Sequence, residues 1–247
     1  MIQLIKGECL EAMKQMPSGS IDAIITDPPY GTTACKWDSV IPFEPMWEQL
    51  NRIIKPNGAI VLFGSEPFSS ALRMSNIKNY KYDWVWDKNT VTGGQNARKQ
   101  PMRRFESICV FYKNQCTYNP QLEDKDKKHI REIKKEHKSI NNHKYSKTFT
   151  VNEKTRTIPI NKKYPSNIIK ISNGSNKGKL HPTQKPILLM EYLIKTYTNE
   201  NETVLDFTMG SGSTGVAAKN LNRDFIGIEL DNKYFEIAKN RINKIKL

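Results

Sequence analysis

The chain has 247 residues, long enough for one large α/β domain, or for a core with an insertion, that buries a substantial apolar interior. Its 39 Lys and Arg outnumber its 25 Asp and Glu, which gives a formal net charge of +14 at pH 7. Such a surplus favours a polyanionic partner, with nucleic acid ahead of an anionic membrane surface. No apolar stretch approaches the roughly 20 residues of a membrane-spanning helix, and the first residues lack a signal-peptide pattern. We therefore expect a soluble, cytoplasmic protein with no membrane partner.

The cysteines and histidines do not form a metal-binding pattern. Cys9, Cys35, Cys109 and Cys116 share no C-x-x-C spacing, and three of the four histidines lie in a polar stretch rich in Lys and Asn. We therefore expect no zinc or other metal site, and no disulfides.

Short apolar runs alternate with helical patterns along the chain. Alternating strands and helices predict a doubly wound, mostly parallel α/β sheet. Pro17, and Pro56 with Gly58, are typical of element ends. The apolar runs predict seven strands, at 2–5, 21–26, 59–64, 82–86, 107–112, 203–207 and 225–230. Apolar residues recur every three to four positions at 9–16, 45–54, 186–198, 213–221 and 232–246, where we expect helices.

The stretch from 115 to 180 differs from the rest, because its strand-like periodicity fades. Residues 121–180 hold 16 Lys and Arg against 6 Asp and Glu, so ten of the fourteen surplus positive charges lie there. The composition predicts an insertion at 115–180 between two parts of one domain, 1–114 and 181–247. The insertion is either a solvated loop or an element that lies on a nucleic-acid backbone, with a small β element that probes bases.

A glycine turn lies near the carboxyl end of the chain. Gly210, Gly212 and Gly215 have G-x-G-x-x-G spacing between a predicted strand and a predicted helix. Glycines allow a tight turn close to a ligand, and the helix start offers free amide donors. Glu229 ends the next strand, 17 residues after Gly212, where a carboxylate can accept hydrogen bonds from ribose hydroxyls. The pattern predicts a ligand with a ribose; the alternative is glycines that only permit close helix packing.

This glycine unit normally begins a nucleotide-binding sheet, whereas here only the helix at 232–246 follows it. A circularly permuted chain would take its next strand from residues 2–5 at the other terminus. Glu8 would then lie at the carboxyl edge of the sheet, beside the adenine of the ligand. The alternative for Glu8 is an ordinary acid at the start of a helix.

Several motifs together resemble one protein family. They are DPPY at 27–30, AIVLFG at 59–64, RRFESICVFYK at 103–113, a basic insertion, HPTQKP at 181–186 and FTMGSGST at 207–214. This order resembles the permuted (β-class) bacterial and phage DNA amino-methyltransferases, over residues 2–114 and 181–240. The resemblance implies a Rossmann-like methyltransferase fold, S-adenosylmethionine as cofactor, double-stranded DNA as substrate, and methylation of adenine N6 or cytosine N4.

The resemblance also implies roles for individual residues and parts. It makes 1–114 the catalytic half, 115–180 the target-recognition region and 181–247 the cofactor-binding half. It assigns catalysis to Asp27, Pro28, Pro29 and Tyr30. It assigns cofactor binding to Glu8, Asp27, Thr183, Gln184, Lys185, Asp206, Phe207, Thr208, Gly210, Gly212, Thr214 and Glu229. Two residues depart from the family pattern, since Thr208 replaces a usual Phe and Glu8 replaces a commoner Asp.

The DPPY motif suits methylation of an exocyclic amino group. The nitrogen lone pair of such a group is delocalised into the base, and acceptors for its two N–H bonds favour the pyramidal form that can attack. The Asp27 carboxylate and the Pro28 carbonyl can be those acceptors, and the prolines hold the carbonyl stiffly. A base inside a duplex must first be extruded, and the ring of Tyr30 can stack on it.

The motif favours adenine, because the cytosine-N4 members of the family more often carry Ser in place of the acid. The alternatives are a cytosine-N4 methyltransferase, a nicotinamide-dependent oxidoreductase that uses the same glycine turn, and a catalytically idle DNA-binding module. A homodimer and a cognate restriction endonuclease are partners that the family resemblance allows. We expect Phe105 to lie in the core, because it belongs to a strand pattern. Phosphate contacts, or merely solubilising charges, are expected at Arg98, Lys99, Arg103 and Arg104.

Overall fold

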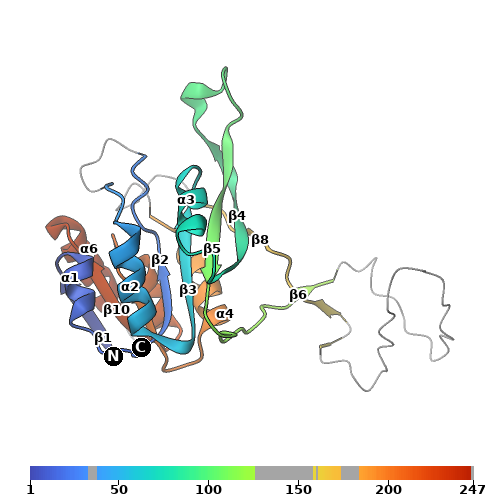
Figure 1. Cartoon of the computed structure of the whole chain (residues 1–247). Coiled ribbons are helices and arrows are strands. Elements are labelled where there is room, and N and C mark those ends of the chain that lie inside the picture. Colours follow the sequence, from blue (N-terminus) through green and yellow to red (C-terminus); the bar gives the residue numbers. More distant parts are fainter. Residues whose placement is uncertain (33–37, 126–157, 160, 174–183, 246–247) are drawn as a thin grey trace. The chain divides into compact units, whose positions relative to one another are not determined.

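The protein is seen here in a computed structural model that describes residues 1–32, 38–125, 158–159, 161–173 and 184–245 (Figure 1). The chain divides into two compact units, one of residues 1–119 with 167–247 and one of residues 120–166. In the smaller unit, β6 (Glu123–Asp124) pairs antiparallel with β7 (Lys162–Lys163). The larger unit contains the main sheet and the site described below.

The main sheet has eight strands in the order β1-β10-β9-β2-β3-β5-β4-β8. All neighbours are parallel except that β5 runs antiparallel to β3 and β4. All seven predicted strands are present. The sheet nevertheless has eight strands and not the expected seven, because β8 was not predicted: a strand of three residues is too short to show a pattern. The strands are β1 (Ile2–Lys6), β2 (Ile21–Thr26), β3 (Ile54–Gly64), β4 (Tyr80–Thr92), β5 (Arg103–Phe111), β8 (Ile168–Lys170), β9 (Thr203–Asp206) and β10 (Asp224–Glu229).

Helices cover both faces of this sheet, as a doubly wound fold requires. The side chains of β3 alternate between the two faces. Ala59, Val61 and Phe63 pack into the core on one face, and Ile60 and Leu62 pack into the core on the other. No helix among the described residues is both long and apolar enough to cross a membrane. One face carries α1 (Cys9–Lys14), α2 (Phe43–Ile53) and α3 (Phe68–Ser75), and the other carries α4 (Ile187–Tyr197), α5 (Ser213–Asn220) and α6 (Asn232–Asn243).

One helix was not predicted, and the expected role of one Pro–Gly pair was wrong. Helix α3 was not expected, because its eight residues bury only Phe68, Ser69 and Leu72, too few to establish a helical period. Pro56 and Gly58 do not end an element but lie within β3, where the pairing with β2 shifts register. A Cβ on Gly58 would lie 2.7 Å from the Asp22 carbonyl oxygen, so this irregular stretch of strand requires glycine.

The strand order confirms the circular permutation. Strand β1 pairs in parallel with β10, from Ile2 beside Phe225 to Lys6 beside Glu229, so the amino-terminal strand follows α6 in space. Strands β9 and β2 are parallel neighbours, and the chain leaves them toward opposite sides of the sheet. Ligands of open α/β sheets bind outside the carboxyl ends of the strands at such a switch point. Both the DPPY motif and the glycine turn begin there.

Strands β4 and β5 continue past the carboxyl end of β3. Gly64, the last residue of β3, pairs with Ser107, which pairs with Val85. The residues from 88 to 105 therefore form a hairpin beyond the sheet edge, here named the β4–β5 arm (Figure 1). Phe105 is 57% exposed, so the prediction of a core position was wrong. Its strand pattern is genuine, but that part of β5 has no helix layer to bury it.

Candidate active site

A cavity of about 610 Å³ opens at the carboxyl ends of β2, β9 and β10, a volume typical of small-molecule sites. The DPPY corner, residues 27–30, lines it, and so do ten predicted cofactor residues, one of which is Asp27 of that corner. Gly212 is not part of the lining, and Thr183 lies outside the described residues. The ten are Glu8, Asp27, Gln184, Lys185, Asp206, Phe207, Thr208, Gly210, Thr214 and Glu229.

The DPPY corner and the glycine turn contact each other directly. The Thr208 hydroxyl donates to the Asp27 backbone carbonyl at 3.1 Å and lies 3.0 Å from the Thr26 hydroxyl. Thr26 in turn donates to the Asp206 carboxylate. Thr208 stands where the family usually has Phe, so in this chain a hydroxyl group joins the two loops.

Asp206 is the buried centre of this polar cluster. Its carboxylate accepts hydrogen bonds from Thr26, from the Thr214 hydroxyl at 2.5 Å, and from the Thr208 amide at 3.2 Å. Burial nevertheless dominates and raises the pKa of Asp206 to about 6. The contacts tie β2, β9 and the start of α5 together, a structural role that the family assignment did not contain.

We predict that Asp206 makes stability depend on pH. Because its pKa is raised, its contribution is fully present below the unfolded value of 3.8 and is lost as pH rises through about 6. Relative to Asp206→Asn, which does not titrate, the wild-type free energy of unfolding should fall by about 2 kcal/mol between about pH 4 and about pH 8. Denaturant unfolding without cofactor measures it; a difference that is independent of pH would contradict the prediction.

The conformation of the DPPY corner is set by Asp38. Its Oδ1 accepts from the backbone N–H groups of Tyr30 at 2.8 Å and Gly31 at 2.9 Å, and its Oδ2 accepts from Thr32 at 2.9 Å. The Tyr30 ring stacks on Phe68 of α3, with centroids 5.0 Å apart, so only its other face is available to a ligand. Sequence reasoning missed Asp38, because nothing in a loop eight residues downstream of Tyr30 shows that its side chain turns back.

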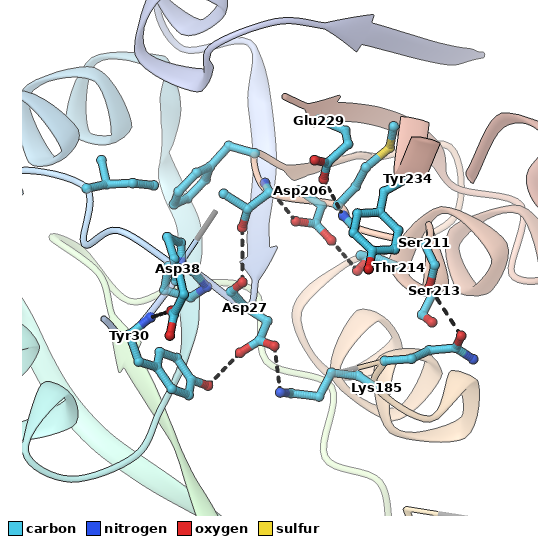
Figure 2. Close-up of a pocket in the computed structure, with 18 of the residues that line it drawn as sticks. Asp27, Tyr30, Asp38, Lys185, Asp206, Ser211, Ser213, Thr214, Glu229 and Tyr234 are labelled. Atoms are coloured by element: carbon cyan, nitrogen blue, oxygen red, sulfur yellow. Dashed lines mark hydrogen bonds and ion pairs between the residues drawn. The ribbon is translucent and has the colours of Figure 1, made fainter. Parts of the chain in front are cut away.

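Both carboxylate oxygens of Asp27 have partners (Figure 2). Oδ1 accepts from the Tyr30 hydroxyl at 2.5 Å, and Oδ2 lies 2.6 Å from the Lys185 ammonium. Burial raises the pKa of Asp27, and the charge of Lys185 opposes that rise. Lys185 was predicted to bind cofactor, but its charged end contacts the acid of the DPPY corner.

The glycine turn and Glu229 form the other end of the cavity. Glu229 accepts from the Gly210 amide through Oε2 and from the Asp231 amide through Oε1, each at 2.8 Å. Burial raises the pKa of Glu229. Gly212 has φ +81°, and a Cβ there would lie 2.9 Å from the Ala238 Cβ, so the turn and its packing against α6 both require glycine at this position.

Glu8 fits both of its expected positions. It lines the cavity just after β1, and its Oε2 accepts from the Glu11 amide at 2.8 Å as the cap of α1. Sequence reasoning gave no role to Lys88, Glu106 and Tyr234, which also line the cavity. Glu106 belongs to the quoted run at 103–113, but only the pairing of β4 with β5 reveals its charged neighbours.

Comparisons with known families, curated proteins and solved structures all identify DNA methyltransferases as similar to this chain. The model of a family described as DNA methylase matches residues 21–240. Type II methyltransferase M.HpaI from Haemophilus parainfluenzae is 31% identical over 256 residues, covering 98% of this chain and 74% of that protein. Type II methyltransferase M.HinfI from Haemophilus influenzae is 28% identical, with coverages of 98% and 68%.

Solved structures match as well. The M1.HpyAVI–SAM complex has a TM-score of 0.65 at 29% identity and covers 98% of this chain and 100% of its own. The PvuII DNA methyltransferase, described as cytosine-N4-specific, has a TM-score of 0.69 at 16% identity, with coverages of 99% and 88%. The second likeness is one of fold alone.

Proposed function

The chain belongs to the DNA methylase family, and on that premise we propose that it methylates adenine N6 at a specific sequence in double-stranded DNA, with S-adenosylmethionine as methyl donor. One observation carries the proposal: the acid of the DPPY corner and the glycine turn line the same cavity and are joined by the Thr208–Asp27 hydrogen bond. The two halves of a methyl-transfer site are therefore within reach of each other.

The chemistry of the cavity fits the cofactor. Glu229, at the end of β10, offers carboxylate oxygens to the ribose hydroxyls of the cofactor. Glu8, beside the end of β1, lines the cavity where the adenine of the cofactor would lie. The M1.HpyAVI structure, which resembles this chain over its whole length, is a complex with SAM. When bound, S-adenosylmethionine supplies a methyl group on a positively charged sulfur.

The DPPY corner would activate the amino group. The Asp27 carboxylate and the Pro28 carbonyl accept hydrogen bonds from its two N–H groups. These hydrogen bonds strengthen as the nitrogen becomes pyramidal, which lowers the barrier to methyl transfer. Asp38 holds the three amides that follow, so the corner is preorganised. The face of Tyr30 opposite Phe68 stacks on the extruded base.

Support for adenine comes from the motif itself, since the chain has Asp27 where cytosine-N4 members more often have Ser. The test is direct. The purified protein is incubated with unmethylated DNA and cofactor carrying a labelled methyl group, and the DNA is digested to nucleosides. We expect label in the deoxynucleoside of N6-methyladenine. Label only in the deoxynucleoside of N4-methylcytosine would overturn the adenine assignment. Unlabelled DNA would favour an idle DNA-binding module.

Sequence specificity is proposed to come from the basic region at 115–180, and single-molecule sequencing of DNA from expressing cells would report the site. A cytoplasmic location, a homodimer and a cognate restriction endonuclease remain predictions. The name Type II methyltransferase given to M.HpaI and M.HinfI supports the last of these.

The β4–β5 arm should contribute phosphate contacts. Arg98, Lys99 and Arg103 are exposed, and no described carboxylate forms an ion pair with them, whereas Arg104 is bound to Asp87 at 2.8 Å. Changing Arg98, Lys99 and Arg103 to Gln should reduce the slope of log affinity for DNA against log salt by about 0.9 per lost contact, without changing cofactor affinity. Fluorescence anisotropy at several salt concentrations measures this slope.

A matched control changes three exposed lysines of the carboxyl-terminal region to Gln, which removes the same charge elsewhere. The arm has no role in DNA binding if both triple variants have equal slopes. The three control positions are Lys233, Lys239 and Lys244.

A further inference from the structure

A chain of four charged side chains starts at Asp27 and leads away from the cavity. The Lys185 ammonium lies 2.6 Å from Asp27 Oδ2 and 3.2 Å from Glu106 Oε2. Glu106 Oε1 accepts from Lys88 at 3.3 Å. Lys185 and Lys88 are only 8% and 4% exposed. The desolvation of buried charges offsets most of the attraction between them, so even a fully paired arrangement of this kind needs an explanation beyond stability.

The four groups come from four parts of the fold. Asp27 follows β2, Glu106 lies on β5, Lys88 on β4, and Lys185 precedes α4. The Lys185 ammonium also lies over the rings of Phe63 and Trp86, 5.1 and 5.9 Å from their centroids, so aromatic walls limit its movement. Residues of β3, β4 and β5 therefore confine the lysine ammonium group between Asp27 Oδ2, the nearer carboxylate oxygen, and Glu106 Oε2.

We propose that Lys185 is a positioning residue whose ammonium group keeps the Asp27 carboxylate charged and oriented to accept the amino group of the base, while Glu106 and Lys88 hold Lys185 in place. This inference rests on the proposed function of Asp27. A carboxylate offers about four lone-pair positions, so Oδ2 can stay paired with the Lys185 ammonium and still accept a hydrogen bond from an N–H group of the base. A protonated Asp27 would present a donor to the amino group and lose this function.

The surroundings of Asp27 explain why a cation is needed. Glu106 and Asp206 face it as like charges, Tyr30 donates to it as a neutral hydroxyl, and Lys185 is the adjacent cation, backed by Lys88. Burial and Glu106 raise the pKa of Asp27, and Lys185 lowers it. Removing Lys185 would leave two carboxylates facing each other in a mostly buried site, where one of them takes up a proton.

The test compares Lys185→Met, Lys185→Arg, Glu106→Gln and the double variant Lys185→Met with Glu106→Gln. The acid limb of the pH profile of kcat/KM should move to higher pH by about 1–3 units in Lys185→Met. It should move to lower pH in Glu106→Gln, lie between the two in the double variant, and stay near wild type in Lys185→Arg. A purely structural role does not produce shifts of opposite sign.

A second measurement does not depend on activity. In protein labelled with ¹³C at Asp carboxyl carbons, the signal absent from Asp27→Asn identifies Asp27, and its titration should follow the same order among the variants. Lys195→Met, on the exposed side of α4, is the matched control and should change neither readout. Affinity for S-adenosylmethionine, measured by calorimetry, should stay unchanged in Lys185→Met.

The outcomes separate the two proposals. If wild-type protein methylates neither base, the proposed function fails, and the Asp27 titration still decides whether Lys185 controls its charge. If wild type is active but the limbs and titrations of all variants coincide, the inference is overturned. Weaker cofactor binding in Lys185→Met with no shift of the limb also overturns it, in favour of the role in cofactor binding implied by the family.

Discussion

Asp27→Asn is expected to lower kcat for methyl transfer by about 100- to 1,000-fold, the usual loss when one preorganised group that stabilises a transition state is removed. The amide can turn an N–H donor toward the amino group, so the nitrogen is no longer drawn into its pyramidal form. The variant keeps the size of the side chain, and Asp38 still holds the loop through the backbone of Tyr30, Gly31 and Thr32. Cofactor affinity and the unfolding midpoint should therefore stay near wild type.

The experiment compares single-turnover transfer to DNA with calorimetric binding of S-adenosylmethionine. Asp22→Asn is the matched control, because Asp22 lies near the start of β2, the strand that Asp27 follows, and binds Lys55 at 2.7 Å and the Thr203 amide at 2.9 Å. It should lower stability and leave the rate of transfer per folded molecule unchanged. Wild-type kcat in Asp27→Asn would remove the acid from the mechanism.

Glu229→Ala is expected to weaken cofactor binding and to leave the rate of methyl transfer at saturating cofactor near wild type, the reverse of Asp27→Asn. Its carboxylate braces the Gly210 and Asp231 amides and is the proposed acceptor for the ribose hydroxyls. Hydrogen bonds to a charged group contribute about 1.5–3 kcal/mol, so the Kd for S-adenosylmethionine should rise by about 10- to 100-fold. At saturating cofactor the rate of transfer should recover. Because burial raises the pKa of Glu229, wild-type cofactor affinity should also weaken as pH falls and the carboxylate becomes protonated.

Calorimetry across pH measures both effects without DNA. Glu236→Ala on α6 is the control, since it removes an exposed acid from the same part of the chain. Equal cofactor affinity in Glu229→Ala and Glu236→Ala would show that the ribose is held elsewhere. Together with Asp27→Asn, the pair of variants separates binding of the donor from activation of the acceptor.

The local signals of the sequence predicted most of the architecture, but not α3 and β8. Apolar runs marked the other seven strands of the main sheet, since strands that helices cover on both faces are apolar on both faces. The motif order predicted the permutation, which the pairing of β1 with β10 confirms. The DPPY corner and the glycine turn were predicted to share one site, and residues of both line one cavity, because parallel neighbouring strands end at the same edge. Their individual roles stay predictions.

What only the tertiary structure decided are contacts between residues that no local pattern relates. Lys185 and Asp27 lie 158 positions apart, and a motif places a lysine in a loop without saying toward which oxygen it points. Phe105 shows the same limit in reverse, because its strand pattern is real but the sheet edge leaves it uncovered. Periodicity records which face of an element is apolar. Which charges meet across four elements depends on strand order and register, which arise only when the whole sheet assembles.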